Sequence, residues 1–169
     1  LNFDSGLMAS SEDALQNMWG LWWFKQALTN QSLELWFTNY LIAPQGASLY
    51  THAFSPLNGA LAYPSLHFTT LAKTYNILTL FHAVASGLAL FGFALSLTKS
   101  YKASLLAGFW LTISPFRMGH SRGHIEMMAM EWLILFAWSY WNLLKDPTFK
   151  KAILAALLLR LALFNTPYH

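Results

Sequence analysis

A long uncharged interval limits what this chain can fold into. No Asp, Glu, Lys or Arg occurs between Lys73 and Lys99. A helix needs about 20 predominantly apolar residues to cross the hydrocarbon core of a bilayer. We therefore expect a membrane-spanning helix over residues 75–97. His82 lies within it, where an imidazole is expected to be hydrogen-bonded to a neighbouring helix.

The composition supports a lipid environment. Hydrophobic residues make up 56% of the chain and charged residues 10%, with a mean hydropathy of +0.38; a soluble domain usually carries about 25% charged residues. So few charges cannot cover a water-facing surface. The net charge of +3 is scattered, with no basic run interleaved with aromatics, which argues against nucleic-acid binding. The absence of cysteine excludes disulfides and thiolate sites.

Three further apolar stretches follow the uncharged interval, at residues 103–116, 127–144 and 151–164. Pro115 lies near the end of the first of them, so we expect a bent helix there that continues into a polar turn. Trp138, Tyr140 and Trp141 lie where an aromatic belt is expected. Residues 73–169 are therefore predicted to form a transmembrane bundle of about four spans.

Lysine placement predicts the orientation of this bundle. Lys99 and Lys102 lie between the first two spans, and Lys145, Lys150 and Lys151 lie between the last two. The positive-inside rule assigns both turns to the cytoplasm. Residues 1–72 and 114–126 then face outward.

Turn signals break residues 43–64 into short pieces, so residues 1–72 are expected to form an outer loop with interfacial helices. The predicted fold class is all-α.

The first of these interfacial helices is predicted over residues 13–28. Its apolar side chains are weighted to one broad face: Leu15, Met18, Trp19, Trp22 and Trp23. The three tryptophans are typical of anchors at the membrane interface. A sugar-stacking platform is the alternative interpretation of the same cluster.

Four segments together resemble a known family. They are SEDALQNMWGLWW at residues 11–23, PQGASLYTH at 44–52, SPLNG at 55–59 and SPFRMGHSRGH at 114–124. In these segments the chain is similar to bacterial multi-span membrane proteins with the GT-C glycosyltransferase fold. The resemblance implies sugar transfer from a polyprenyl-phosphate-linked donor at the outer face of the inner (cytoplasmic) membrane. It also implies a transmembrane helix before the acidic outer loop and further spans, so the chain is expected to be the N-terminal portion of a longer protein.

The resemblance implies a catalytic carboxylate in the outer loop. It points to Asp13, with Glu12 as its neighbour. Sugar transfer needs a carboxylate to deprotonate the acceptor hydroxyl. The alternative is that both acids stabilise the start of the helix that follows them, together with Ser10 and Ser11.

The leaving phosphate needs cationic groups, which Arg117, Arg122 and Arg160 can supply as phosphate-binding residues. Arg160 lies inside the fourth predicted span, where a lone charge is costly. An ion pair with Glu131 is therefore the alternative for this arginine.

His120, His124 and Glu131 form a candidate metal site. Their spacings of four and seven residues place all three on one face of a continuous helix. Two imidazoles and a carboxylate suit a divalent metal such as Zn, Mn or Fe. Two alternatives remain: a phosphate-facing polar cluster, or a structural network in which Glu131 pairs with Arg117 or Arg160. Glu126 can replace Glu131 in each of these roles.

A second class of function fits the same helices. The chain is then a catalytically silent subunit that provides a scaffold or docking surface within a larger membrane complex. Membrane lipid is an expected partner under both hypotheses. The enzyme adds the lipid-linked sugar donor, and the scaffold adds protein partners.

Overall fold

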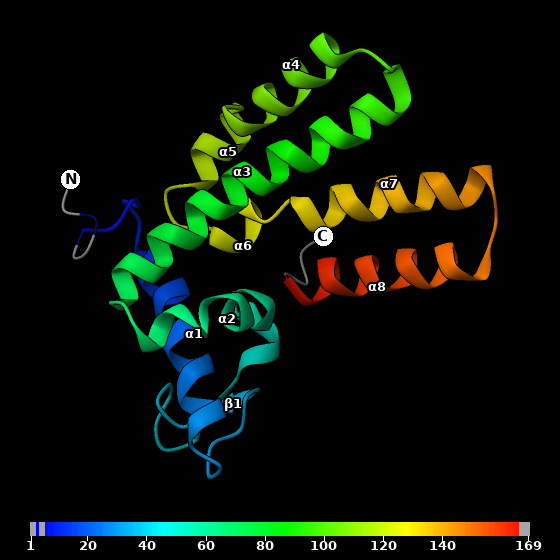
Figure 1. Ribbon diagram of the computed structural model, residues 1–169. Helices are drawn as coiled ribbons and strands as arrows, with labels where there is room; N and C mark the ends of the chain where they lie inside the picture. The colour runs from blue at the N-terminus through cyan, green and yellow to red at the C-terminus, as the bar shows by residue number, and fades with distance from the viewer. Residues whose placement is uncertain (1–2, 4–5, 166–169) are drawn as a thin grey trace.

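The computed structural model describes residue 3 and residues 6–165, and most of these residues are helical (Figure 1). The elements are, in chain order, α1 (Glu12–Thr29), β1 (Phe37–Thr38), β2 (Ala47–Ser48), η1 (Leu49–Thr51), α2 (Pro56–Ala62), η2 (Ser65–His67), α3 (Leu71–Thr98), α4 (Tyr101–Thr112), α5 (Pro115–His120), α6 (Ile125–Met128), α7 (Glu131–Lys145) and α8 (Phe149–Asn165). The prediction of an all-α chain is confirmed, apart from one pair of two-residue strands.

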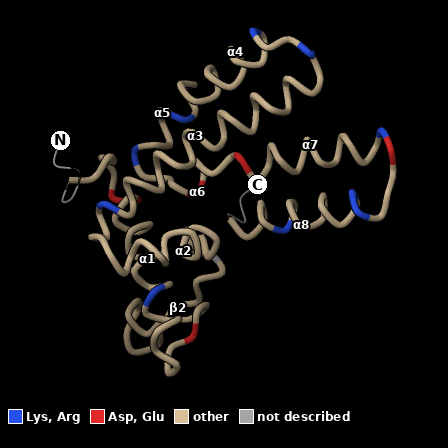
Figure 2. The backbone as a smooth tube through the Cα atoms, in the orientation of Figure 1, with Lys and Arg blue, Asp and Glu red and all other residues tan. Residues whose placement is uncertain are grey.

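Two long helical hairpins form one end of the molecule, α3 with α4 and α7 with α8 (Figure 1). They contact each other through α3 and α7 and diverge toward their tips. Lysines lie at both tips, on the side away from α1 and α2 (Figure 2). The assignment of both lysine-bearing turns to the cytoplasmic side of a membrane stays a prediction.

Small residues bring α3 and α4 together. A Cβ added to Gly108 would lie 2.5 Å from the carbonyl oxygen of Gly87, so the two backbones nearly touch at this point. Small residues at such crossings are typical of packed membrane helices. Ser100 begins α4 by accepting a hydrogen bond from the Ala103 amide, directly after Lys99 ends α3 in a left-handed conformation (φ 56°).

Among the described residues, α3 is the one helix long and apolar enough to cross a membrane. It has 28 residues, whereas α4, α7 and α8 have 12, 15 and 17. Even α8 reaches only about 25 Å at 1.5 Å per residue, and a hydrocarbon core is about 30 Å thick. The three shorter helices occur where the other spans were predicted, but four complete crossings remain a prediction.

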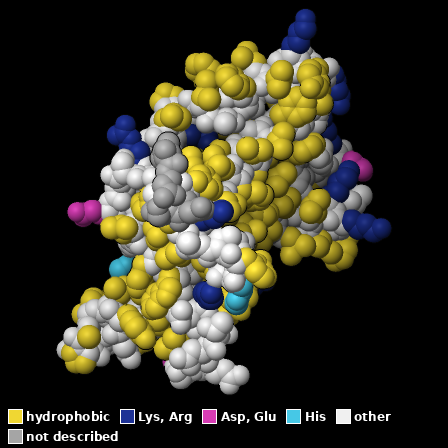
Figure 3. Space-filling model, turned by 60° about the vertical axis from the view of Figure 1, so that its left-hand side comes forward, with side chains coloured by type: hydrophobic (Ala, Val, Ile, Leu, Met, Phe, Trp, Pro, Cys, Tyr) yellow, Lys and Arg dark blue, Asp and Glu magenta, His cyan; other side chains and the backbone are white. Residues whose placement is uncertain are grey.

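Large apolar side chains cover the outside of both hairpins (Figure 3). Exposed examples are Leu88 on α3, Leu106 and Trp110 on α4, and Leu154 and Leu157 on α8. An apolar patch this wide is unusual on a monomer in water and indicates a membrane or protein neighbour.

The segment between α4 and α7 differs from the predicted continuous helix. The expected bend at Pro115 is a break: α4 ends at Thr112, and Pro115 starts α5, whose first turn is capped by Ser114 accepting from the Arg117 amide. The helix then breaks at residues 121–124 and again at 129–130. The third long helix therefore begins at Glu131, not at residue 127.

The outer region contains the predicted helix, but its buried face is different. Ala14, Asn17 and Leu21 are buried, whereas Leu15 is 61% exposed. The Ala14 side of α1 packs against α2 and α3, and Trp23 is buried beneath the loop that follows α1, donating to the Leu35 carbonyl. That loop holds the antiparallel pair of β1 and β2, which the turn signals alone did not predict.

Candidate functional site

Asp13 and His124 lie far apart in the sequence and are brought together by the fold. Asp13 lies in the first turn of α1, and His124 directly precedes α6. Their Oδ2 and Nε2 atoms are 3.4 Å apart, and the side chains are 50% and 40% exposed. The pair is therefore an ionisable contact open to a substrate or to solvent.

Hydrogen bonds to backbone carbonyls hold the start of α1 against the turn that precedes His124. The amides of Ser10 and Ser11 both donate to the carbonyl of Arg122, at 3.0 and 3.1 Å. The buried Asn17 amide group donates to the carbonyls of Gly123 and Asp13, at 2.8 and 3.1 Å. These bonds fix the turn before His124 against the start of α1.

Gly123 is required by this close approach. A Cβ at this position would collide with the Ser11 hydroxyl and lie 3.0 Å from the Ala14 amide. The Ser11 hydroxyl itself donates to the Arg122 carbonyl at 2.9 Å. Ser11 occupies the N-cap position without capping α1 through its side chain, so that part of the capping interpretation is wrong.

Glu126 contacts the ring nitrogen of His124 that faces away from Asp13. Its Oε1 lies 3.6 Å from Nδ1 of His124, so the imidazole sits between two carboxylates. Glu126 is buried, and burial raises the pKa of its carboxyl above the usual range, while its own backbone amide and His124 lower it. Two carboxyl groups of different exposure thus share one histidine.

His120 lies beside this pair without joining it. Its ring centre is 5.3 Å from that of His124 and 4.3 Å from that of Phe116. Burial, followed by the charge of His124, lowers the pKa of His120. A neutral His120 next to the Asp13–His124 contact is the expected state near neutral pH.

The predicted metal triad is not assembled. No three His, Asp or Glu side chains among the described residues are placed to hold a metal ion. The reason is the broken helix, because the interruptions at residues 121–124 and 129–130 turn Glu131 away from the face that carries His120 and His124. Glu126, the alternative carboxylate, is the one that reaches His124.

Glu131 instead belongs to a buried network between the two hairpins. Its Oε1 is 2.5 Å from Nδ1 of His82, and its Oε2 accepts from the Ser86 hydroxyl at 2.8 Å. The other ring nitrogen of His82 lies 3.1 Å from Oδ1 of Asn58 on α2. The prediction that His82 bonds to a neighbouring helix is confirmed. The predicted ion pairs of Glu131 with Arg160 or Arg117 are not formed among the described residues, because His82 and Ser86 are its partners.

A sequence signal for this network existed. His82 and Ser86 are four residues apart in the uncharged interval, so they share one helix face. Two polar residues on one face of an apolar helix indicate a polar partner on another element. The sequence did not show which carboxylate is this partner, because that depends on where the helix breaks between residues 121 and 131.

Arg117 is the most unusual charge in the protein. The residue is 1% exposed, and none of its three guanidinium nitrogens has a hydrogen-bond partner among the described residues. Burial lowers its pKa, and the negative charge of Glu131 opposes that shift. A buried charge is normally paired and hydrogen-bonded. Arg117 is therefore a site that an anion would stabilise.

The other predicted phosphate-binding arginines lie elsewhere. Arg122 is exposed in the turn after α5, where its carbonyl holds the start of α1. Arg160 is exposed on α8, with its guanidinium carbon 5.5 Å from the ring centre of Phe164. Glu12, the predicted neighbour of the base, is exposed on α1.

No family model, curated protein or solved structure matches this chain. What the site can do must therefore be argued from its own residues.

Proposed function

We propose that this chain is part of a membrane glycosyltransferase-like protein. Its site transfers a sugar from a polyprenyl-phosphate-linked donor to an acceptor hydroxyl at the outer face of the bacterial inner membrane. The observation that carries the proposal is the contact of Asp13 with His124, backed by Glu126. It combines an exposed carboxylate, which can act as a general base, with an imidazole that can orient it.

Asp13 acts as the base in this reaction. It takes the proton of the acceptor hydroxyl as the acceptor oxygen forms its bond to the anomeric carbon of the sugar. The bond from that carbon to the phosphate oxygen breaks, and the polyprenyl phosphate leaves with the electron pair. His124 positions the Asp13 carboxylate from 3.4 Å, and Glu126 positions the imidazole.

Arg117 supplies positive charge for the leaving phosphate. The support is its unpaired, buried guanidinium, which already carries the desolvation cost that an incoming phosphate would offset. A fixed cation in a water-poor site stabilises developing negative charge more than the same cation does in water. The divalent metal expected from the sequence has no three donors assembled among the described residues, so no step of this reaction is assigned to it.

The test uses membranes that contain the full natural protein. Donors carrying radiolabelled mannose, glucose or N-acetylglucosamine on polyprenyl phosphate are supplied, and transfer of label to acceptors is measured. We expect Asp13→Asn to lower the transfer rate by about 10²- to 10⁴-fold, the usual share of a general base. Glu34→Gln, an exposed acid beyond the end of α1, is the matched control. Equal rates in Asp13→Asn and the unchanged protein would overturn the proposal.

A scaffold role is the second candidate. It is favoured by the exposed apolar faces of α4 and α8, which protein neighbours could cover as well as lipid. Recovery of the protein from mild detergent in a fixed stoichiometry with other chains, with no transfer of any donor sugar, would support this role over the enzyme.

A further inference from the structure

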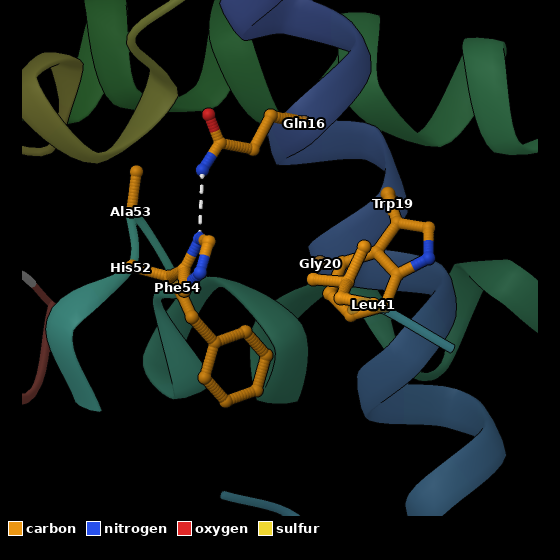
Figure 4. A pocket seen from close by; sticks show the side chains of 7 residues that line it. All are labelled: Gln16, Trp19, Gly20, Leu41, His52, Ala53 and Phe54. Atoms are coloured by element: carbon orange, nitrogen blue, oxygen red, sulfur yellow. Dashed lines mark hydrogen bonds between the residues drawn. The ribbon is translucent and has the colours of Figure 1, made fainter. Parts of the chain in front are cut away.

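A pocket lies beside the candidate base, on the same helix. It encloses about 330 Å³ between α1 and the segment that precedes α2. Small-molecule sites typically occupy roughly 300–1,000 Å³. Figure 4 shows Gln16 and His52 pointing toward each other on one side of the pocket, with Trp19 and Leu41 on the other.

The polar side of the pocket suits hydroxyl groups. The Gln16 amide nitrogen and Nδ1 of His52 are 3.3 Å apart, a long contact for a hydrogen bond. An amide and an imidazole each offer both a donor and an acceptor. Vicinal hydroxyls need the same combination, because every hydroxyl donates one hydrogen bond and accepts others.

The apolar side suits the carbon–hydrogen face of a sugar ring. Trp19 stacks on Trp23 at 5.7 Å with 5° between the ring planes, which holds the indole in a fixed orientation beside the pocket. Phe54 adds a buried ring to the half-buried Trp19. Gly20 lines the pocket without a side chain and so leaves room for a ligand.

The pocket is also close to Asp13. Gln16 follows Asp13 by three residues on α1, which places it about 4.5 Å along the axis and about 60° around it. A ligand held by Gln16 therefore lies within about one helical turn of the candidate base.

We infer that this pocket binds a pyranose unit of the acceptor and presents its hydroxyl to Asp13. The inference rests on the proposed function, since it assigns the acceptor as a saccharide. It also gives the Trp19 cluster a role beyond membrane anchoring.

Direct binding tests this inference without relying on catalysis. The full protein in lipid nanodiscs is mixed with methyl β-D-glucopyranoside, methyl α-D-mannopyranoside or N-acetyl-D-glucosamine. Saturation-transfer NMR then reports which sugar protons contact the protein. We expect at least one sugar to give ring-proton signals, and Gln16→Ala and His52→Ala to weaken its affinity by about fivefold or more, the effect of one lost hydrogen bond.

Gly20→Ala is the sharpest variant. Its added Cβ would lie 3.5 Å from Cδ2 of Phe54, an ordinary contact, so the fold should tolerate a methyl group that fills part of the pocket. The controls are Gln31→Ala and His67→Ala, a glutamine and a histidine that are exposed outside the pocket. The sugar signals should weaken in Gly20→Ala and persist in both controls.

Two results would overturn the inference. One is the absence of ring-proton signals from all three sugars; the other is equal signals in the pocket variants and the controls, as expected if the pocket holds a lipid acyl chain. Asp13→Asn separates the two proposals, because it should lower transfer by about 10²- to 10⁴-fold while ring-proton signals from the bound sugar persist. Sugar transfer with an unaltered acceptor KM in Gly20→Ala would contradict the pocket assignment alone.

Discussion

At the scale of single residues, two buried ionisable side chains distinguish this protein. Arg117 and Glu126 are 1% and 3% exposed, and each has polar atoms without a partner among the described residues. Native proteins rarely tolerate such groups without a functional reason. Both lie within the segment of α5 and α6 that also carries His124.

Glu126 should make stability depend on pH. Burial raises the folded-state pKa of its carboxyl, so the folded protein binds more protons than the unfolded chain between the unfolded and folded pKa values. The free energy of unfolding should therefore fall as pH rises through this window, starting near the unfolded value of 4.5. Glu126→Gln should flatten this dependence in thermal unfolding followed by circular dichroism. The same slope in both proteins would contradict the prediction.

Arg117→Met should separate stability from activity. Replacing a buried charge that lacks hydrogen bonds by an apolar side chain of similar length removes the cost of its unsatisfied donors, so we expect unfolding to become harder by about 1–3 kcal/mol without ligand. Sugar transfer should fall at the same time, because the leaving phosphate loses its cation. Chemical denaturation and the transfer assay measure the two effects. A variant that is less stable would indicate that Arg117 has a structural partner instead.

At the scale of elements, the site depends on how closely the turn at residues 121–124 approaches α1. Three hydrogen bonds to the Arg122 carbonyl and one to that of Gly123 connect these segments. The chain separation is over 100 residues, so α1 and the turn meet only in the folded protein.

Gly123→Ala should disrupt this approach. The added Cβ would collide with Ser11 and crowd the Ala14 amide, and such overpacking usually costs about 1–3 kcal/mol. Gly119→Ala is a matched control, because a Cβ there meets nothing within 4 Å. Denaturant unfolding should therefore show a lower midpoint for Gly123→Ala alone. Equal midpoints would mean that the turn shifts without cost.

At the scale of the whole molecule, the two lysine-bearing tips lie away from α1 and α2 (Figure 2). This polarity predicts a topology. In cells, a cysteine at Ser121 should react with a membrane-impermeant maleimide added from outside, and one at Ser100, between α3 and α4, should not. Residues 1–169 contain no natural cysteine, so no second site within them is labelled. The reverse pattern would place Asp13 and His124 on the cytoplasmic side.

The sequence by itself determined the helices and their approximate positions. The uncharged interval, the lysines at the turns and Pro115 are local signals, and each acts through the chain immediately around it. The approximate positions of α3, α4 and α8 were therefore predictable, whereas a bend was expected where α4 ends before Pro115. So was the need of His82 for a partner, because a polar side chain in an apolar helix must be satisfied wherever the helix packs.

Only the tertiary structure decided which side chains meet. Residue spacing could not predict the contact of Asp13 with His124, which depends on a turn packed against α1 through Gly123. The metal triad is not assembled because the helix is broken at residues 121–124, where Gly123 is a sequence sign of a break, and again at 129–130. Glu131 therefore reaches His82, and Glu126 lies beside His124. Residue spacing predicts a shared face only while a helix is continuous, and whether it continues is decided by the hydrogen bonds and packing of distant segments.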